Sequence, residues 1–241
     1  MSLISMIGPD TPATFRFNGA ELAAWLIEYC ALQPDGTVLD VASAAGRGAS
    51  QLMNYLSPTG AYRGFDLLQP CVEWCQQNLT TVRPNFQFAH ADLHSPLYNP
   101  TGTQTSEHFR FPYEDGSFDV VLLSSVFTHM LPSAVTHYVE EIRRVLKPGG
   151  RVLVTFYLLD DEVRRLMQTS RSRRIHFIDV EPGVYAVANL NNPEGAVAYE
   201  KRYATDLWST HGFVVQGVYP GKWPGRLNSY SGQDIVIARV V

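Results

Sequence analysis

The sequence has few cysteines, few charged residues and no long apolar run. Its three cysteines among 241 residues are too few for a disulfide framework and favour a reducing compartment. The net charge of −4 argues against the strong basic field on which bulk nucleic-acid binding depends. The longest apolar stretches, such as residues 152–159, fall far short of the ~20 residues that a membrane-spanning helix needs.

The amino-terminal residues are not expected to act as a secretion signal. Residues 1–12 lack a basic stretch, and Gly8 and Pro9 interrupt their apolar part. With 45% hydrophobic residues, the chain has the composition and length of one α/β domain. We therefore expect a single cytoplasmic domain over residues 1–241, a monomer or homodimer, with no nucleic-acid or membrane partner.

Short apolar segments alternate with segments of helical periodicity along the first two thirds of the chain. Asn18 is a candidate N-cap for the first helix. This rhythm predicts βαβ units around a parallel sheet. The predicted strands are 37–42, 61–66, 85–92, 118–125 and 151–159, and the predicted helices are 21–32, 48–57, 70–79 and 135–146.

Two segments interrupt this rhythm. Residues 93–117 form a long polar connection that carries Tyr98 and Phe109, which either line an acceptor pocket or pack down as a loop. Residues 160–211 are too long for one crossover helix. They predict an inserted cap or lid before a terminal pair of strands, 212–220 and 233–241.

A turn of small residues and three strand-end acids predict a ligand site. Asp40 ends the first strand, and Ala42, Ala44 and Gly46 follow at every second position. Small residues let a ligand approach the backbone, and the next helix offers its amino-terminal amides. Asp66 and Asp92 end the second and third strands. Each acid alone is explained by a helix cap or loop, but together they mark the carboxyl edge of a sheet, where ligands bind.

The chain resembles the class I S-adenosylmethionine-dependent methyltransferases over roughly residues 15–160. The resemblance implies a three-layer α/β sandwich around a mostly parallel seven-stranded sheet. Its implied strand order is 3-2-1-4-5-7-6, with strand 7 antiparallel. The motifs that carry it are VLDVASAAGRG (38–48), YRGFD (62–66), AHADL (89–93), FPYEDGSFDVVLLSSVFTHM (111–130) and EEIRRVLKPGGRVLV (140–154).

The resemblance also implies a cofactor, S-adenosylmethionine, with S-adenosylhomocysteine as its product. It departs from the family's acid-x-Gly-x-Gly-x-Gly turn at Ala42 and Ala44, where alanine is acceptable if φ is negative. The implied cofactor contacts are Asp40, Ala42, Ala44 and Gly46 for the methionine end, Asp66 and Leu67 for the ribose, Asp92 and Leu93 for the adenine, and Ser124 for the sulfonium side.

The implied reaction is methyl transfer to a small molecule, with O-methylation of a sugar or natural product favoured. Residues 124–127 read Ser-Ser-Val-Phe, and not the Asn-Pro-Pro-Tyr or Asp-Pro-Pro-Tyr that would suggest amide or amine methylation. His129 is a candidate general base, or a structural histidine at the start of the next helix. The candidate acceptor contacts are Tyr98, Phe109, Arg171 and Trp223.

Other interpretations remain open. An enzyme that binds a dinucleotide would favour an intact G-x-G-x-x-G turn, which the two alanines interrupt. A peptide or protein methyltransferase could use the arginines at 164–174, which otherwise form a solvated helix face. A non-catalytic S-adenosylmethionine-binding module is suggested by the alanines alone. We expect no metal site, because Cys71 and Cys75 fill the apolar face of one helix.

Overall fold

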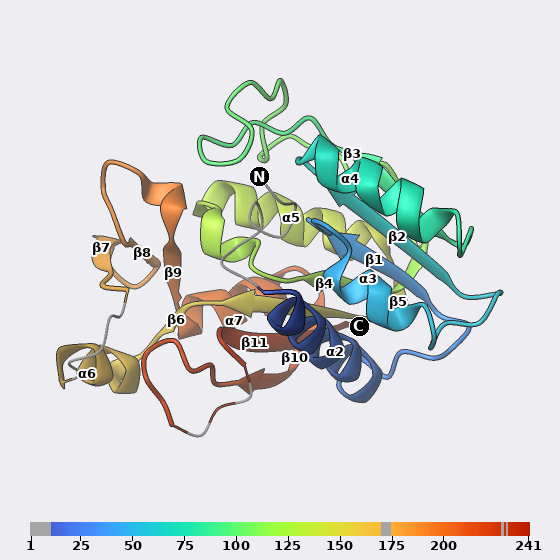
Figure 1. The fold of residues 1–241 in the computed structure, drawn as a ribbon. Helices are drawn as coiled ribbons and strands as arrows, with labels where there is room; N and C mark the ends of the chain where they lie inside the picture. Colours follow the sequence, from blue (N-terminus) through green and yellow to red (C-terminus); the bar gives the residue numbers. More distant parts are fainter. Residues whose placement is uncertain (1–10, 170–174, 228, 230) are drawn as a thin grey trace.

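A seven-stranded sheet forms the centre of the computed structural model, which describes residues 11–169, 175–227, 229 and 231–241 (Figure 1). Its order is β10-β11-β5-β4-β1-β2-β3, and β11 runs antiparallel to both of its neighbours. This confirms the expected order, with β10 and β11 as strands 6 and 7. The strands are β1 (Thr37–Val41), β2 (Ala61–Asp66), β3 (Phe86–His90), β4 (Phe118–Leu123), β5 (Leu146–Phe156), β10 (Phe213–Tyr219) and β11 (Asp234–Val240).

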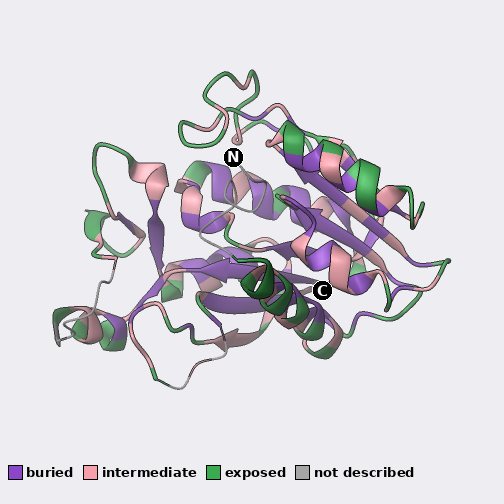
Figure 2. Cartoon of the chain, viewed as in Figure 1, coloured by how far each residue is buried: buried purple, intermediate pink, exposed green. Residues whose placement is uncertain are grey.

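Helices cover both faces of this sheet, which makes the expected three layers. Alternate residues of β1 divide between the two faces, so that Val38 packs in one core cluster and Leu39 in the other. The inner strands are accordingly buried on both sides, whereas the edge strands β10 and β3 carry exposed residues (Figure 2). One face carries α2 (Pro12–Glu28), α3 (Arg47–Leu52) and α4 (Gln69–Cys75), and the opposite face carries α5 (Pro132–Val145) and α7 (Lys201–Thr210).

The helices depart from their predicted bounds: α3 ends at Leu52 and not at residue 57, and α5 begins at Pro132 and not at residue 135. α2 begins at Pro12, where Thr11 Oγ1 accepts the Thr14 N–H at 3.1 Å, so the prediction that Asn18 caps this helix is wrong. Threonine followed by proline is an effective helix start, and it overrides the later asparagine. α4 ends at Cys75 and continues as a π-helical turn, Gln76–Thr80. None of the helices in the described ranges is long and apolar enough to cross a bilayer.

A second, smaller sheet lies beside the main one. It contains β6 (Leu158–Leu159), β9 (Val197–Glu200), β8 (Tyr185–Val187) and β7 (Ile178–Glu181), in that order. The same region holds α6 (Asp161–Thr169) and the 3₁₀ turn η3 (Pro193–Gly195). We call this sheet with α6 and η3 the small subdomain. α7 packs in the main core through Ala204, Leu207 and Trp208, and β6, β8 and β9 also contribute side chains to that core. That the small subdomain acts as a cap stays a prediction.

Candidate active site

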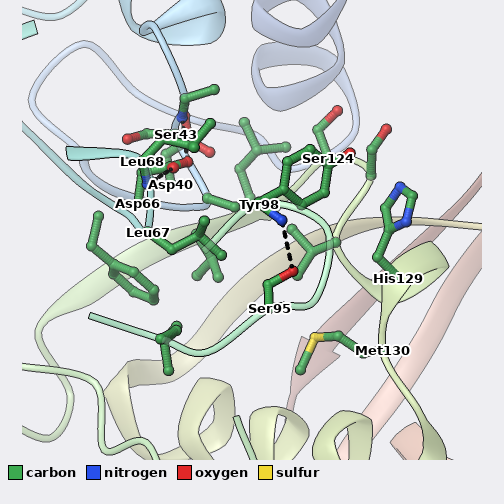
Figure 3. A pocket seen from close by; sticks show the side chains of 18 of the residues that line it. Asp40, Ser43, Asp66, Leu67, Leu68, Ser95, Tyr98, Ser124, His129 and Met130 are labelled. Atoms are coloured by element: carbon green, nitrogen blue, oxygen red, sulfur yellow. Dashed lines mark hydrogen bonds between the residues drawn. The ribbon is translucent and has the colours of Figure 1, made fainter. Parts of the chain in front are cut away.

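A cavity of about 340 Å³ lies at the carboxyl ends of β1, β2 and β4. The strand order reverses between β1 and β4, and ligands of open α/β sheets bind at such a switch point. Figure 3 shows two groups of side chains in this cavity. Asp40, Ser43 and Asp66 lie at one end, His129 and Met130 lie at the other, and Tyr98 lies between them.

The turn after β1 is left-handed at every second residue. The φ angles are 61° at Ala42, 46° at Ala44 and 70° at Gly46, so the condition of negative φ for the two alanines is not met. A side chain at such a φ costs roughly 1–2 kcal/mol. Ala42 and Ala44 line the cavity. Gly46 does not; a Cβ there would lie 2.7 Å from Leu79 Cδ1, so its absence allows the turn to pack against the α4 region.

Glycine at both alanine positions should stabilise the fold. The Ala42→Gly/Ala44→Gly double variant should raise the free energy of unfolding by about 1 kcal/mol, because relief of two left-handed alanines exceeds the entropy cost of two glycines. Urea unfolding followed by circular dichroism measures this. The control is Ala49→Gly inside α3, which should lower stability instead. A double variant less stable than the natural protein would show that the turn carries no strain.

Asp66 joins the turn after β1 to the turn after β2, at the end of the cavity that contains Asp40 and Ser43. Its buried carboxylate accepts the N–H of Ala44 and the N–H of Leu68, each at 2.7 Å. Burial raises the pKa of this carboxyl, and the two N–H groups partly offset that effect. Each oxygen keeps a second lone pair, so the carboxylate has capacity for two further donors such as vicinal hydroxyls. The buried Ser43 Oγ, also at this end, has no hydrogen-bond partner among the described residues.

Asp40 is buried at the floor of the same end. The Tyr62 hydroxyl donates a hydrogen bond to its carboxylate. Burial raises the pKa of Asp40 to about 7; the charge of Asp66 adds to this effect, while Tyr62 and the Arg47 guanidinium oppose it. A cation placed beside Asp40 would favour its ionised form. The floor of the cavity is therefore suited to an ammonium group.

Asp40 should make stability depend on pH. Its pKa rises from 3.8 to about 7 on folding, so the folded chain binds this proton more tightly than the unfolded chain does. The proton therefore contributes to the free energy of unfolding fully below pH 3.8, and this contribution is lost as the pH rises from there through about 7. Asp40→Asn removes this loss. The quantity to compare is the free energy of unfolding of Asp40→Asn minus that of the natural protein. We expect this difference to be about 2–3 kcal/mol larger at pH 8 than at pH 5. Urea unfolding at both pH values measures it. The exposed Asp35→Asn is the control, and a pH-independent difference for Asp40→Asn would contradict the prediction.

His129 is held at the other end of the cavity by the small subdomain. It closes the 3₁₀ turn η2 (Phe127–His129), whose other two residues are fully buried. Its Nδ1 lies 3.0 Å from the backbone oxygen of Glu194 in η3. A carbonyl only accepts, so Nδ1 carries a proton, and the neutral form of the ring has its lone pair at Nε2. His129 also packs edge-on against Tyr98, with ring centroids 6.0 Å apart.

A polar cluster fixes the end of β4 next to the cavity. Ser125 has a φ of 61°, and its N–H donates to Thr155 Oγ1 at 2.8 Å. The hydroxyls of Ser125 and Thr155 both donate to Gln233 Oε1, at 3.0 and 2.6 Å. These bonds join the ends of β4, β5 and β11, and so they position Ser124, which lines the cavity.

Asp92 lies apart from the other strand-end acids. Leu67 and Leu93 line the cavity, but Asp92 does not. Its carboxylate accepts the Thr103 hydroxyl at 2.7 Å and the Asn99 amide at 3.1 Å, and these bonds hold its pKa below the usual range. The residue thus organises the loop after β3. Its role in adenine binding stays a prediction.

Three of the expected acceptor contacts lie outside the cavity or outside the described residues. Phe109 is buried against Phe65 and Phe111, as expected for a loop that packs down. Trp223 Nε1 donates to the buried Asp234 at 2.6 Å, away from the cavity. Arg171 lies outside the described residues. Of the acceptor contacts predicted, Tyr98 is the one that the structure places in the cavity.

Several residues that line the cavity were not predicted from the sequence as site residues. Tyr138 has the helical spacing of a core residue, and it is both buried and part of the lining. Glu194 and Gln233 are far along the chain from every recognised motif, so no local pattern indicated them. The other lining residues without a predicted role include Ser43, Arg47, Leu68, Ser95, Ser106, Ser125 and Met130.

Comparison with known proteins indicates the family. Residues 39–154 match the model of a methyltransferase domain family, and this segment runs from within β1 to within β5 and contains most of the cavity lining. The matched segment is just under half of the chain, and together with the strand order it supports a class I S-adenosylmethionine-dependent methyltransferase, with S-adenosylmethionine as the cofactor. The orphaned Ser43 hydroxyl, the spare lone pairs of Asp66 and the floor at Asp40 fit its polar groups.

Individual relatives differ in the reaction that their names describe. The chain is 33% identical over 118 residues to a phthiotriol/phenolphthiotriol dimycocerosates methyltransferase of Mycobacterium ulcerans, with 49% of the chain and 36% of the relative covered. It is 29% identical to a ubiquinone/menaquinone biosynthesis C-methyltransferase of Ectopseudomonas mendocina, with 53% and 44% covered. The matches thus span less than half of these relatives.

A solved structure shows the same fold over most of the chain. It is the Burkholderia thailandensis 1,6-didemethyltoxoflavin-N1-methyltransferase, with bound 1,6-didemethyltoxoflavin and S-adenosylhomocysteine. The TM-score is 0.58 at 16% identity, with 92% of this chain and 78% of that one covered. The methyltransferase fold therefore extends beyond the segment that the family model matches.

Proposed function

We propose that this methyltransferase transfers the methyl group of S-adenosylmethionine to a hydroxyl oxygen of a small acceptor, with His129 as the general base. The observation that carries the proposal is the fixed tautomer of His129 in the same cavity as Asp66. An alcohol is a weak nucleophile until a base takes its proton, whereas many amines need positioning alone. A neutral imidazole with a free Nε2 supplies that base.

Different residues of the cavity would bind the cofactor and act on the acceptor. Asp66 would hold the ribose hydroxyls, Asp40 the ammonium group and Ser43 a further polar atom of S-adenosylmethionine. When bound, this cofactor supplies a methyl group already activated by a sulfonium. His129 accepts the proton of the acceptor hydroxyl at Nε2, while Tyr98 and Met130 enclose that end of the cavity. Alignment and exclusion of water then account for most of the acceleration.

The size of the cavity favours a small acceptor. The whole cavity, with the end assigned to S-adenosylmethionine included, has about 340 Å³, near the lower end of the ~300–1,000 Å³ typical of small-molecule sites, so the part left for the acceptor is small. A peptide or protein acceptor bound by the arginine-rich segment is the alternative. In the described part of that segment, Arg164 pairs with Asp179 at 2.9 Å and also with Glu200, so it is engaged within the small subdomain. The small-molecule reading is therefore the one we favour.

Product analysis tests the proposal. The protein is incubated with S-adenosylmethionine and pools of hydroxylated metabolites, and release of S-adenosylhomocysteine is followed by chromatography. Products from active pools are then assigned by mass spectrometry and NMR. An O-methyl product supports the proposal, and an N- or C-methyl product would contradict it. Binding of the cofactor without turnover in any pool would favour a non-catalytic module.

A further inference from the structure

The end of the cavity at His129 and Met130, here called the acceptor end, is acidic. Glu194, in η3 of the small subdomain, lines the cavity beside His94 and His129. Among the described lining residues Arg47 is the one Lys or Arg, and it interacts with Asp40 at the opposite, cofactor end. Nothing described at the acceptor end therefore offers a fixed positive charge to an anionic acceptor.

The Glu194 carboxylate is partly buried. No hydrogen bond or ion pair to it is found among the described residues, although its backbone oxygen binds His129 Nδ1 at 3.0 Å. Burial and the neighbouring charge of Glu107 raise the pKa of Glu194, and His94 opposes them. A half-buried carboxylate near a second acid, without a cation to neutralise it, is a site that a positively charged ligand would stabilise.

The position of Glu194 relative to His129 is set by one short connection. The backbone oxygen of Glu194 fixes the imidazole, and the same residue lines the cavity, where its carboxylate interacts with Glu107 and His94. A ligand hydroxyl at His129 Nε2 would therefore place neighbouring parts of the ligand within reach of Glu194. One residue of the small subdomain can thus orient the base and contact the ligand.

We propose that Glu194 selects acceptors that carry an ammonium group in addition to the hydroxyl that is methylated. This inference rests on the proposed O-methylation and names the substrate class of the same site: a small hydroxylated amine. An acceptor with a carboxylate in the same place would meet repulsion from Glu194 and Glu107. An ammonium group would form a charge-assisted hydrogen bond in a partly desolvated position.

Three phenols of similar size whose short side chains end in groups of different charge provide the test. Tyramine, tyrosol and 4-hydroxyphenylacetate share a hydroxyphenyl ring and end in an ammonium, a neutral hydroxyl and a carboxylate. Each is titrated by calorimetry into protein already saturated with S-adenosylhomocysteine. We expect tyramine to bind about tenfold or more tightly than either of the others, the gain of one hydrogen bond to a charged group.

Two variants separate Glu194 from its surroundings. Glu194→Gln should remove the preference for tyramine and leave the affinity for tyrosol within about twofold. Glu107→Gln is the matched control, because it removes an equal charge nearby but outside the cavity lining; it should keep most of the preference. Equal affinities for the three phenols, tighter binding of the carboxylate, no binding of any, or a preference that survives Glu194→Gln would each overturn the inference. The initial titration with S-adenosylhomocysteine tests the cofactor site by itself, and turnover with other acceptors would leave the proposed function intact.

Discussion

Replacement of His129 by alanine should lower kcat by about 100-fold or more and leave the affinity for S-adenosylhomocysteine within about threefold. General base catalysis contributes about 10²–10⁴ to rate, and His129 lies at the end of the cavity away from Asp66. The measurement compares steady-state turnover with calorimetric titration of S-adenosylhomocysteine. A loss in kcat without a loss in cofactor affinity would assign His129 to the chemical step.

A matched histidine provides the control for this prediction. His137 on α5 lies outside the cavity lining, and its Nε2 lies 2.9 Å from the backbone oxygen of Phe109. His137→Ala should keep kcat within about threefold, because it removes a structural contact and no base. If His129→Ala and His137→Ala retained equal turnover, His129 would be a structural histidine that anchors the small subdomain.

Replacement of Asp66 by alanine should weaken binding of S-adenosylhomocysteine by at least about 100-fold. Two hydrogen bonds from ribose hydroxyls to a charged group contribute about 1.5–3 kcal/mol each. The structure adds a second effect. The N–H groups of Ala44 and Leu68 would lose their acceptor, so the free energy of unfolding should fall by about 2–4 kcal/mol. Calorimetry and urea unfolding measure the two effects separately.

Asp119→Ala separates lost affinity from lost stability. Asp119 lies near the start of β4, at the opposite edge of the sheet, where it pairs with Lys147 at 2.8 Å and accepts from Thr37. Its removal should lower stability without a change in cofactor affinity. If Asp66→Ala bound S-adenosylhomocysteine as tightly as Asp119→Ala, the ribose assignment would be wrong, and another residue at the cofactor end would hold the ribose.

The sequence was most informative where function depends on neighbours along the chain. Asp66 ends β2 and Asp40 lies one residue before the end of β1, and parallel strands bring their carboxyl ends to one edge of the sheet. The order of the seven strands came from the family resemblance, and the structure confirms it. The spacing of apolar residues along the chain is also sufficient to predict the buried faces of the helices, since burial follows the helical period.

The acceptor end could not be predicted in the same way. Glu194 and Gln233 reach the cavity from the small subdomain and from the segment before β11, and tertiary packing alone brings them there. The φ angles of Ala42 and Ala44 were equally hidden, because an alanine gives no local signal for a left-handed conformation. Phe109 has the aromatic character of a pocket wall, yet the same character lets it pack into the core.

Calorimetric titration of the protein with S-adenosylmethionine, S-adenosylhomocysteine and NAD tests the central claim, that the cavity at β1, β2 and β4 holds S-adenosylmethionine. We predict binding of the first two and none of NAD, with both interactions weakened at least about 100-fold by Asp66→Ala. Binding of NAD alone would contradict the account and require a different reaction. Absence of binding by all three would also contradict the account, and would indicate that the turn with Ala42 and Ala44 no longer binds a cofactor.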